Sequence, residues 1–412
     1  MNLGRPTAKP SSPGVHAPKP VKNSFSELIA AGLSPKNLVL YGAILIMLWL
    51  ALAPMFMLIW GSLRSADPGV PGATFTLSNY VRAFTEPFVY SVLWNTLVYS
   101  FGSTLVSVVV GVGLAWFVER TNIFLRNLIF ILVVIRIAVP QMMMTIAWIL
   151  LLSPNSGWIN HIIQSITGIE KLINIYSMGG MIWVEGIDKA PVVFLLASAA
   201  FRSLDPTFEE AALMCGARLK SIIRYITLPI IIPAIAAGIL LAFLTNLESF
   251  EVPTLIGLRE GIQTFSSAIY FLTTGQKNEL TMASTYGMVF FVIAAIGLYL
   301  YQKMTAESKK FMTITGKGYR PTRIDLGPWR WPLSLLIVIF LLFSYILPIF
   351  ILSWTSLLPF YSIPSYEALQ RISLENFEFI FKQGTTNRAL QNSLFLAVLA
   401  GTLVIFLTGI LS

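Results

Sequence analysis

Long apolar stretches alternate with short polar segments along most of the chain. A helix needs about 20 predominantly apolar residues to cross the hydrocarbon core of a bilayer. The pattern therefore predicts an all-α polytopic membrane protein, in which Pro54 kinks the first span and Arg136 and Pro140 break the third. The predicted spans are residues 38–63, 91–118, 127–152, 178–201, 228–247, 281–302, 331–357 and 390–412.

Two polar segments flank the first six spans. Residues 1–36 are rich in Pro, Lys and Ser and predict a disordered tail, with a short helix at 25–31. Residues 304–330 form a basic linker before the seventh span. Most Lys and Arg residues fall on the side of the membrane that holds these two segments, so the positive-inside rule places the N-terminus in the cytoplasm.

An internal repeat divides the chain. The pattern Pro-x-Phe-x-Leu-x-Trp-x-Ser-Leu begins at position 54 and again at position 348. Two further patterns, each with a central Asn, begin at 77 and 93 and return at one common offset, at 374 and 390. Six spans per copy bring the chain back to the same side, so we predict a parallel tandem repeat. Its first domain is 37–303 and its second, incomplete domain is 331–412; we expect the sequence to be a fragment or a truncated reading frame.

Residues 205–229 are the one amphipathic island between long apolar segments. A first helix is predicted from a favourable N-cap, a proline at the first helical position and two glutamates in the first turn: Asp205, Pro206, Glu209 and Glu210. Gly216 then predicts a turn, and a second, basic helix follows it. The segment is therefore expected to lie as helix, turn and helix on the membrane surface.

The spacing within this segment resembles the EAA loop of ATP-binding-cassette (ABC) importer permeases. Seven positions carry the resemblance: Glu210, Ala211, Ala212, Gly216, Ile226, Leu228 and Pro229. The resemblance implies a type I importer fold in which this segment, here called the coupling loop, docks on a partner ATPase dimer. It also implies that ATP and Mg are held by that partner, and that a periplasmic or extracellular solute-binding protein delivers the cargo. The alternative is an ordinary interfacial amphipathic helix.

Composition narrows the function classes. The chain is 56% hydrophobic and 11% charged, which excludes a soluble globular protein. Its net charge of +9 comes from residues between spans, so it has a topological role and does not indicate nucleic-acid binding. One Cys and two distant His residues predict neither an intrachain disulfide nor a metal site in this chain. No catalytic constellation or phosphate-binding loop is recognisable, so we expect no enzymatic activity and no bound cofactor.

Charged residues inside spans are costly and usually face a cavity or a charged partner. Four are candidates for lining a translocation path: Arg136, Glu185, Glu248 and Glu251. The alternative is that they form ion pairs that fix helix packing, and the spacing of Glu185 and Lys189 allows such a pair.

The fused halves, with the runs at 174–177, 180–186 and 248–257, are similar to ferric-iron importer permeases. The resemblance implies a permease that moves iron(III) inward across a bacterial inner membrane. Thiamine, phosphonate or another small solute is the alternative cargo. An ion-coupled secondary transporter, a membrane-embedded enzyme and a fragment without transport activity are the alternative functions.

Overall fold

The structure, a computed structural model, describes residues 35–203, 207–275, 279–308 and 323–411. Within these residues the chain is helical apart from loops and two isolated β-bridges, Arg64–Phe75 and Thr121–Ile324. The predicted all-α fold is confirmed. The short helix expected at 25–31, the N-cap Asp205 and Pro206 lie outside the described residues.

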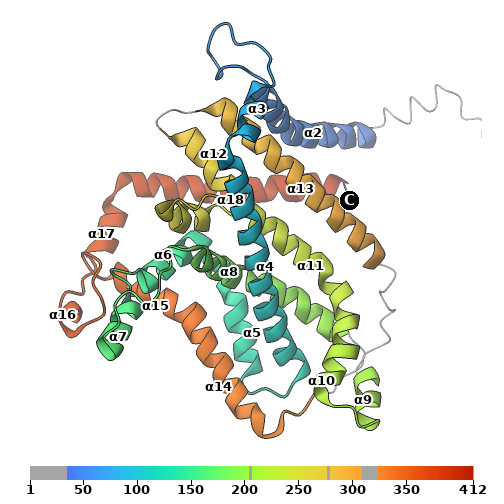
Figure 1. Cartoon of the computed structure of the whole chain (residues 1–412), viewed down its shortest axis with the longest axis vertical. Helices are drawn as coiled ribbons and strands as arrows, with labels where there is room; N and C mark the ends of the chain where they lie inside the picture. Colours follow the sequence, from blue (N-terminus) through green and yellow to red (C-terminus); the bar gives the residue numbers. More distant parts are fainter. Residues whose placement is uncertain (1–34, 204–206, 276–278, 309–322, 412) are drawn as a thin grey trace, which may run out of the picture. The chain divides into compact units, whose positions relative to one another are not determined.

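The helices follow one another along the chain as Figure 1 labels them. The α-helices up to the coupling loop are α2 (Pro35–Ser62), α3 (Ser78–Thr85), α4 (Pro87–Arg120), α5 (Arg126–Ile135), α6 (Gln141–Leu152), α7 (Trp158–Thr167) and α8 (Met178–Ser203). The later ones are α9 (Thr207–Met214), α10 (Leu219–Ile222), α11 (Leu228–Glu248), α12 (Phe265–Thr274), α13 (Leu280–Ser308), α14 (Arg330–Leu341), α15 (Leu347–Ser356), α16 (Tyr366–Leu369), α17 (Glu375–Lys382) and α18 (Gly384–Leu411). Short 3-10 turns lie at Arg136–Ala138, Leu258–Glu260 and Gly327–Trp329, and π-helical turns at Ile223–Thr227, Pro253–Gly257 and Leu342–Ile346.

Five described helical segments are long and apolar enough to cross a membrane: Val39–Ser62, Pro87–Arg120, Leu280–Lys303, Gly327–Ser356 and Gly384–Ile410. Two bent pairs raise the number to seven if each pair is one span. One pair is α5 with α6, bent by 106° where the third span was predicted to break. The predicted fourth span forms α8. This helix is not among the apolar segments, because it carries three charged residues, Glu185, Asp188 and Lys189.

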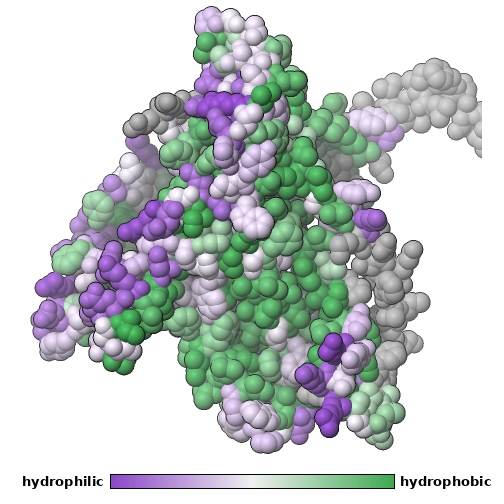
Figure 2. Space-filling view, in the orientation of Figure 1, coloured by the Kyte–Doolittle hydropathy of each residue, from purple (hydrophilic) through white to green (hydrophobic). Residues whose placement is uncertain are grey.

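The chain divides into two compact units, residues 1–55 with 388–412, and residues 56–387. In the first unit the described residues belong to α2 and α18, and both helices leave nearly all their apolar side chains exposed. In the second unit, Figure 2 shows broad hydrophobic areas over the long helices. Hydrophilic residues gather near α9 and α10 and around α16 and α17. Such apolar exposure is expected where a surface faces lipid or other spans.

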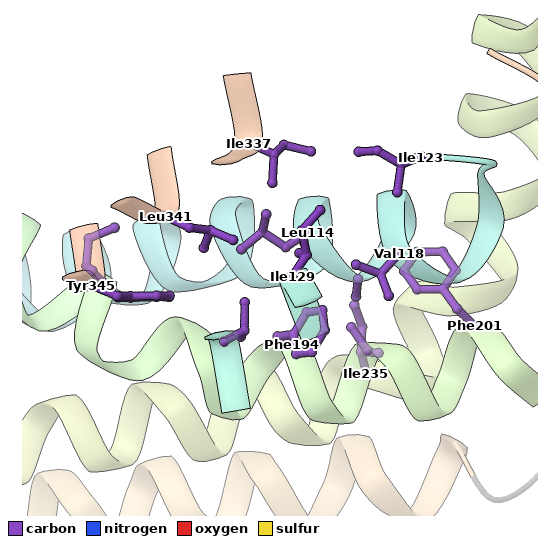
Figure 3. Packing of buried hydrophobic residues seen from close by; sticks show 14 of the residues in the cluster. Leu114, Val118, Ile123, Ile129, Phe194, Phe201, Ile235, Ile337, Leu341 and Tyr345 are labelled. Atoms are coloured by element: carbon purple, nitrogen blue, oxygen red, sulfur yellow. The ribbon is translucent and has the colours of Figure 1, made fainter. Parts of the chain in front are cut away.

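The main core of the second unit joins both predicted domains. Leu114 and Val118 of α4 pack with Phe194 of α8, and Leu341 at the end of α14 lies in the same buried cluster (Figure 3). The start of the predicted second domain is therefore built into the core of the predicted first domain, although the linker 304–330 separates them in sequence.

Helices α4 and α8 approach closely because Gly111 lies between them. A Cβ at Gly111 would lie 2.7 Å from the carbonyl oxygen of Ala190 and 2.9 Å from the backbone nitrogen of Phe194. Both of these are backbone atoms, so neither can move aside without shifting α8. One turn away along the contact, Ser107 of α4 donates a hydrogen bond of 3.0 Å to the carbonyl of Gly186.

Matching local hydrogen bonds occur at two of the predicted repeat positions. Asn79 donates to the carbonyls of Ser62 and Arg64, at 3.1 and 2.7 Å. Asn376 donates to the carbonyls of Ser356 and Leu358 at the same two distances. In each copy an eight-residue helix, α3 or α17, begins next to this asparagine. The asparagines are therefore structural residues that fix the loop after a span.

We expect Gly111→Ala to lower the melting temperature of the purified chain, because overpacking a tight contact costs about 1–3 kcal/mol. Gly113→Ala is the matched control on the same helix, since nothing lies within 4 Å of a Cβ there. That control should be neutral or slightly stabilising, by up to about 1 kcal/mol. Equal melting temperatures of the two variants in detergent would show that the α4–α8 contact is not tight.

Candidate functional site

The coupling loop has the predicted helix–turn–helix shape, and its turn is closed by a specific hydrogen-bond pattern. The backbone N–H of Gly216 donates to Leu213, and that of Ala217 donates to Ala212, at 2.9 and 3.0 Å. Gly216 has φ +78°, the left-handed conformation that ends many helices in this pattern. A side chain at Gly216 would meet no atom within 4 Å, so its backbone conformation, and not lack of space, requires glycine.

Glu209 anchors this loop to the membrane-spanning helices. Its carboxylate forms an ion pair with Arg120 at the end of α4, and accepts a hydrogen bond of 2.7 Å from the hydroxyl of Thr227, just before α11. Arg120 is 1% exposed and Glu209 is 3% exposed. A buried charge without its partner is strongly destabilising, so the pair holds α4, α9 and the start of α11 in one arrangement.

The opposite side of the loop is exposed and partly apolar. Met214 is 90% exposed and Tyr225 is 70% exposed, and Leu213 and Cys215 beside the turn are also exposed. The basic residues of the second helix are exposed as well: Arg218, Lys220 and Arg224. The loop thus presents an apolar turn with a basic flank, a composition suited to contact with another protein.

The seven residues predicted for ATPase coupling all lie in this helix–turn–helix and its junction with α11. Ala211, Gly216, Leu228 and Pro229 are exposed, and Ala212 and Ile226 are half-buried. Glu210 lies in α9. Sequence reasoning did not find the three residues that hold the loop, Arg120, Glu209 and Thr227. The first-turn position of Glu209 was the only signal, because Arg120 is far away in sequence.

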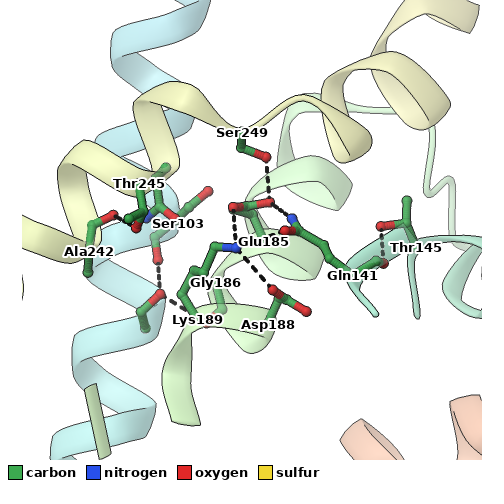
Figure 4. A network of polar contacts seen from close by, with 12 residues as sticks. Ser103, Gln141, Thr145, Glu185, Gly186, Asp188, Lys189, Ala242, Thr245 and Ser249 are labelled. Atoms are coloured by element: carbon green, nitrogen blue, oxygen red, sulfur yellow. Dashed lines mark hydrogen bonds and ion pairs between the residues drawn. The ribbon is translucent and has the colours of Figure 1, made fainter. Parts of the chain in front are cut away.

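A second polar site lies at the other end of the same helices (Figure 4). Glu185 of α8 is fully buried, and its Oε2 accepts hydrogen bonds from the hydroxyls of Tyr99 and Ser249, each at 2.8 Å. Gln141 at the start of α6 donates to the same oxygen at 2.5 Å. Lys189, one turn along α8, lies 3.6 Å from the other carboxylate oxygen, so the predicted pair of Glu185 and Lys189 is present.

Arg136 extends this site across the bend between α5 and α6. Its guanidinium forms an ion pair with Asp188 and donates a hydrogen bond of 2.9 Å to the carbonyl of Val139. Lys189 bridges Asp188 and Gln141, at 3.2 and 2.8 Å. Two cations and two anions meet in this charged cluster, so it is balanced in charge. The cluster ties the bend to α8. This agrees with the alternative that these charged residues form ion pairs that fix helix packing.

The four residues predicted for the translocation path are not all brought together. Arg136 and Glu185 belong to the charged cluster. Glu248 ends α11 and is exposed, and Glu251 follows it and is partly exposed. Neither forms a hydrogen bond or ion pair with the described residues, whereas Ser249 between them is buried against Glu185. Only Glu248 and Glu251 therefore have carboxylates that are free to meet a solute.

The chain is similar in sequence and in fold to known transport proteins. Residues 107–304 match the family described as binding-protein-dependent transport system inner membrane component. The ferric transport system permease protein FbpB of Actinobacillus pleuropneumoniae is 24% identical over 321 residues, which are 77% of this chain and 45% of that protein. The inner membrane ABC transporter permease protein YdcU of Escherichia coli K12 is 26% identical over 265 residues, 60% of this chain and 83% of that protein.

One solved structure supports the fold. It is a crystal structure of a bacterial ABC transporter involved in the import of the acidic polysaccharide alginate. One of its chains aligns with a TM-score of 0.54 and 22% identity, over 69% of this chain and 96% of that chain. The predicted resemblance to ABC importer permeases is confirmed. This chain spans less than half the length of the FbpB relative.

Removing the cation of the buried pair tests the anchor of the coupling loop. We expect Arg120→Gln to lower the free energy of unfolding by about 3–5 kcal/mol, because Glu209 would keep a buried charge without a partner. Arg202→Gln is the control: its side chain is 58% exposed and pairs with Glu119, and exposed pairs contribute at most about 1 kcal/mol. Unfolding by SDS in mixed micelles, followed by circular dichroism, measures both.

The double variant Arg120→Gln/Glu209→Gln separates charge from packing. It should recover part of the lost stability, since no charge is then left buried. If Arg120→Gln is no worse than Arg202→Gln, the buried pair does not hold the loop.

Proposed function

Residues 107–304 belong to the family of binding-protein-dependent inner membrane components, and we propose that the chain forms the membrane pathway of an ABC importer. ATP is hydrolysed by separate ATPase subunits, which dock on the coupling loop, and a solute-binding protein delivers the cargo on the other side. The protein is a multi-pass inner-membrane subunit with its N-terminus in the cytoplasm. The observation that carries this proposal is the coupling loop, whose turn is exposed while its Glu209 is buried against the spans.

Two helices give the docking site a direct mechanical connection to the opposite end of the protein. Helix α4 carries Tyr99, which contacts Glu185, and Arg120, which contacts Glu209. At 1.5 Å per residue these two residues are roughly 30 Å apart along the helix. Helix α11 repeats the arrangement, because Thr227 before its start contacts Glu209 and Ser249 after its end contacts Glu185.

Movement of the coupling loop therefore acts on both helices at once. A displacement of Glu209 is passed to α4 through Arg120 and to α11 through Thr227. Because α8 carries Glu185, rotation of α4 or α11 strains the charged cluster at their other ends. In this proposal the ATPases drive the loop together with its spans, and the cluster keeps α6 and α8 moving with them.

The cargo that we propose is iron(III), carried as a solute and not as a resident metal. The support is the ferric transport relative, at 24% identity over 77% of this chain. Thiamine, phosphonate or another small solute is the alternative, and the structural neighbour from an alginate importer illustrates how widely cargo varies on this fold. Uptake of radioactive iron by membrane vesicles that contain the importer, in competition with each alternative solute, decides among them.

Two substitutions at the turn test the docking of the ATPase. We expect Gly216→Val to abolish co-purification with the partner ATPase, because a β-branched residue in the left-handed conformation costs about 1–2 kcal/mol or more and reshapes the turn. Gly216→Asn is the matched control, since asparagine tolerates this conformation, and it should retain the ATPase. If both variants co-purify equally with the ATPase, or if the unmodified chain binds none, ion-coupled secondary transport becomes the better account.

Two further substitutions distinguish a role in the translocation path from a role in helix packing. Glu248→Gln should leave the melting temperature unchanged but lower uptake of a cationic solute by up to about tenfold, since an exposed carboxylate concentrates cations at a cleft. Asp188→Asn should lower the melting temperature, because it leaves Arg136 buried without its anion. Glu260→Gln, at another exposed carboxylate, is the control for uptake. Unchanged uptake in Glu248→Gln would remove Glu248 from the path.

A further inference from the structure

A basic pocket lies where three spans meet the membrane surface. It has a volume of about 540 Å³ and is lined by the loop from the end of α4 into α5, together with the chain just before α14. Its lining includes three arginines, Arg126, Arg323 and Arg330, and no carboxylate. Spans end at Arg120 and begin at Gly327, which sets the pocket at the level of the lipid headgroups.

The positive charges of the three arginines in the pocket can interact with a bound anion. Arg126 and Arg323 form no ion pair or hydrogen bond with the described residues, and the Nε of Arg330 is buried without a partner among them. Two anions lie nearby. Glu119 lines the adjoining pocket with Arg126 and Arg323 and is paired with Arg202. The other is Asp325, and hydrogen bonds from the backbone of Gly327 and from Asn122 lower the pKa of its carboxyl group. Four arginines against two carboxylates leave a local excess of positive charge.

The pocket is held in shape by backbone contacts. Ile324 pairs with the chain at Thr121, through hydrogen bonds that join it to Arg120 and Asn122. The backbone N–H of Phe124 donates to the hydroxyl of Ser334 in α14, at 3.0 Å. Leu125, in the pocket wall, has φ +57°, an uncommon conformation for a residue that is not glycine. Such strain persists only where surrounding contacts impose it.

Aromatic residues beside the pocket indicate that it lies at the membrane interface, next to lipid. Trp329 and Trp331 are 67% and 62% exposed at the start of the span, and Trp331 lies 4.8 Å from the ring of Phe124. Tryptophans gather where apolar chains meet headgroups. Arg330 lies over the ring of Phe124, so a cation and apolar rings share this site.

We propose that this pocket binds the headgroup of an anionic phospholipid, with its phosphate among the three arginines and its acyl chains beside Trp329 and Trp331. Basic pockets between spans on the cytoplasmic side bind such headgroups. A zwitterionic lipid of the same chain length would bring an ammonium group toward the arginines and bind less well.

Native mass spectrometry of the purified full chain in uncharged detergent tests this site. Phosphatidylglycerol should bind roughly tenfold more tightly than phosphatidylcholine with the same acyl chains. Arg126→Gln/Arg323→Gln should lose roughly thirtyfold in phosphatidylglycerol affinity, because each arginine near the surface contributes about 1 kcal/mol and about 1.4 kcal/mol corresponds to a factor of ten. Arg218→Gln/Lys220→Gln removes the same charge from the coupling loop and should bind the lipid as the unmodified chain does.

Two further measurements keep the result decisive. Arg323 is exposed, so Arg323→Gln alone should fold normally and still weaken binding by a few-fold. Inorganic phosphate at millimolar concentration should not displace the lipid. Equal binding of the two lipids, an equal loss in both double variants, or displacement by phosphate would each overturn the proposal. None of these readouts involves the ATPase, so they stand apart from the proposed import function.

Discussion

The carboxylate of Glu209 is cut off from water, and the arrangement of three helices depends on how its charge is compensated. Arg120 supplies the opposite charge from the end of α4, and Thr227 supplies a hydroxyl from the start of α11. A buried pair of this kind is costly to form and more costly to break. The pair fixes the position of α9, because it joins α9 to the end of α4 and the start of α11.

The same two helices meet a second buried carboxylate, Glu185, at their other ends. Tyr99 and Ser249 are its hydroxyl donors, as Arg120 and Thr227 are the donors to Glu209. The two helices thus join two polar sites in an otherwise apolar protein, and they run between these sites in opposite chain directions. Close contact of α4 with α8 at Gly111 completes the connection, since α8 carries Glu185. This geometry can pass a displacement between the coupling loop and the charged cluster.

Local signals in the sequence predicted much of this structure, and long-range partners account for the rest. Five of the eight predicted spans follow from apolar length. The turn at Gly216 follows from backbone preference, and the pair of Glu185 and Lys189 follows from helical spacing. The 106° bend between α5 and α6 was predicted only as a break, because its angle depends on Arg136 reaching Asp188 in another helix. The burial of Glu209 could not be predicted, since Arg120 lies 89 positions earlier in the chain.

In the proposed importer, the turn of the coupling loop is the docking surface for an ATPase. Cys215 is the only cysteine in the chain and is exposed in that turn, so it reports on this surface without any substitution. The direct measurement is the rate at which a membrane-impermeant maleimide labels Cys215 in inside-out vesicles, with and without the ATPase. The account predicts rapid labelling that the ATPase blocks. Labelling that the ATPase leaves unchanged, or that occurs only from the opposite side of the membrane, would contradict it.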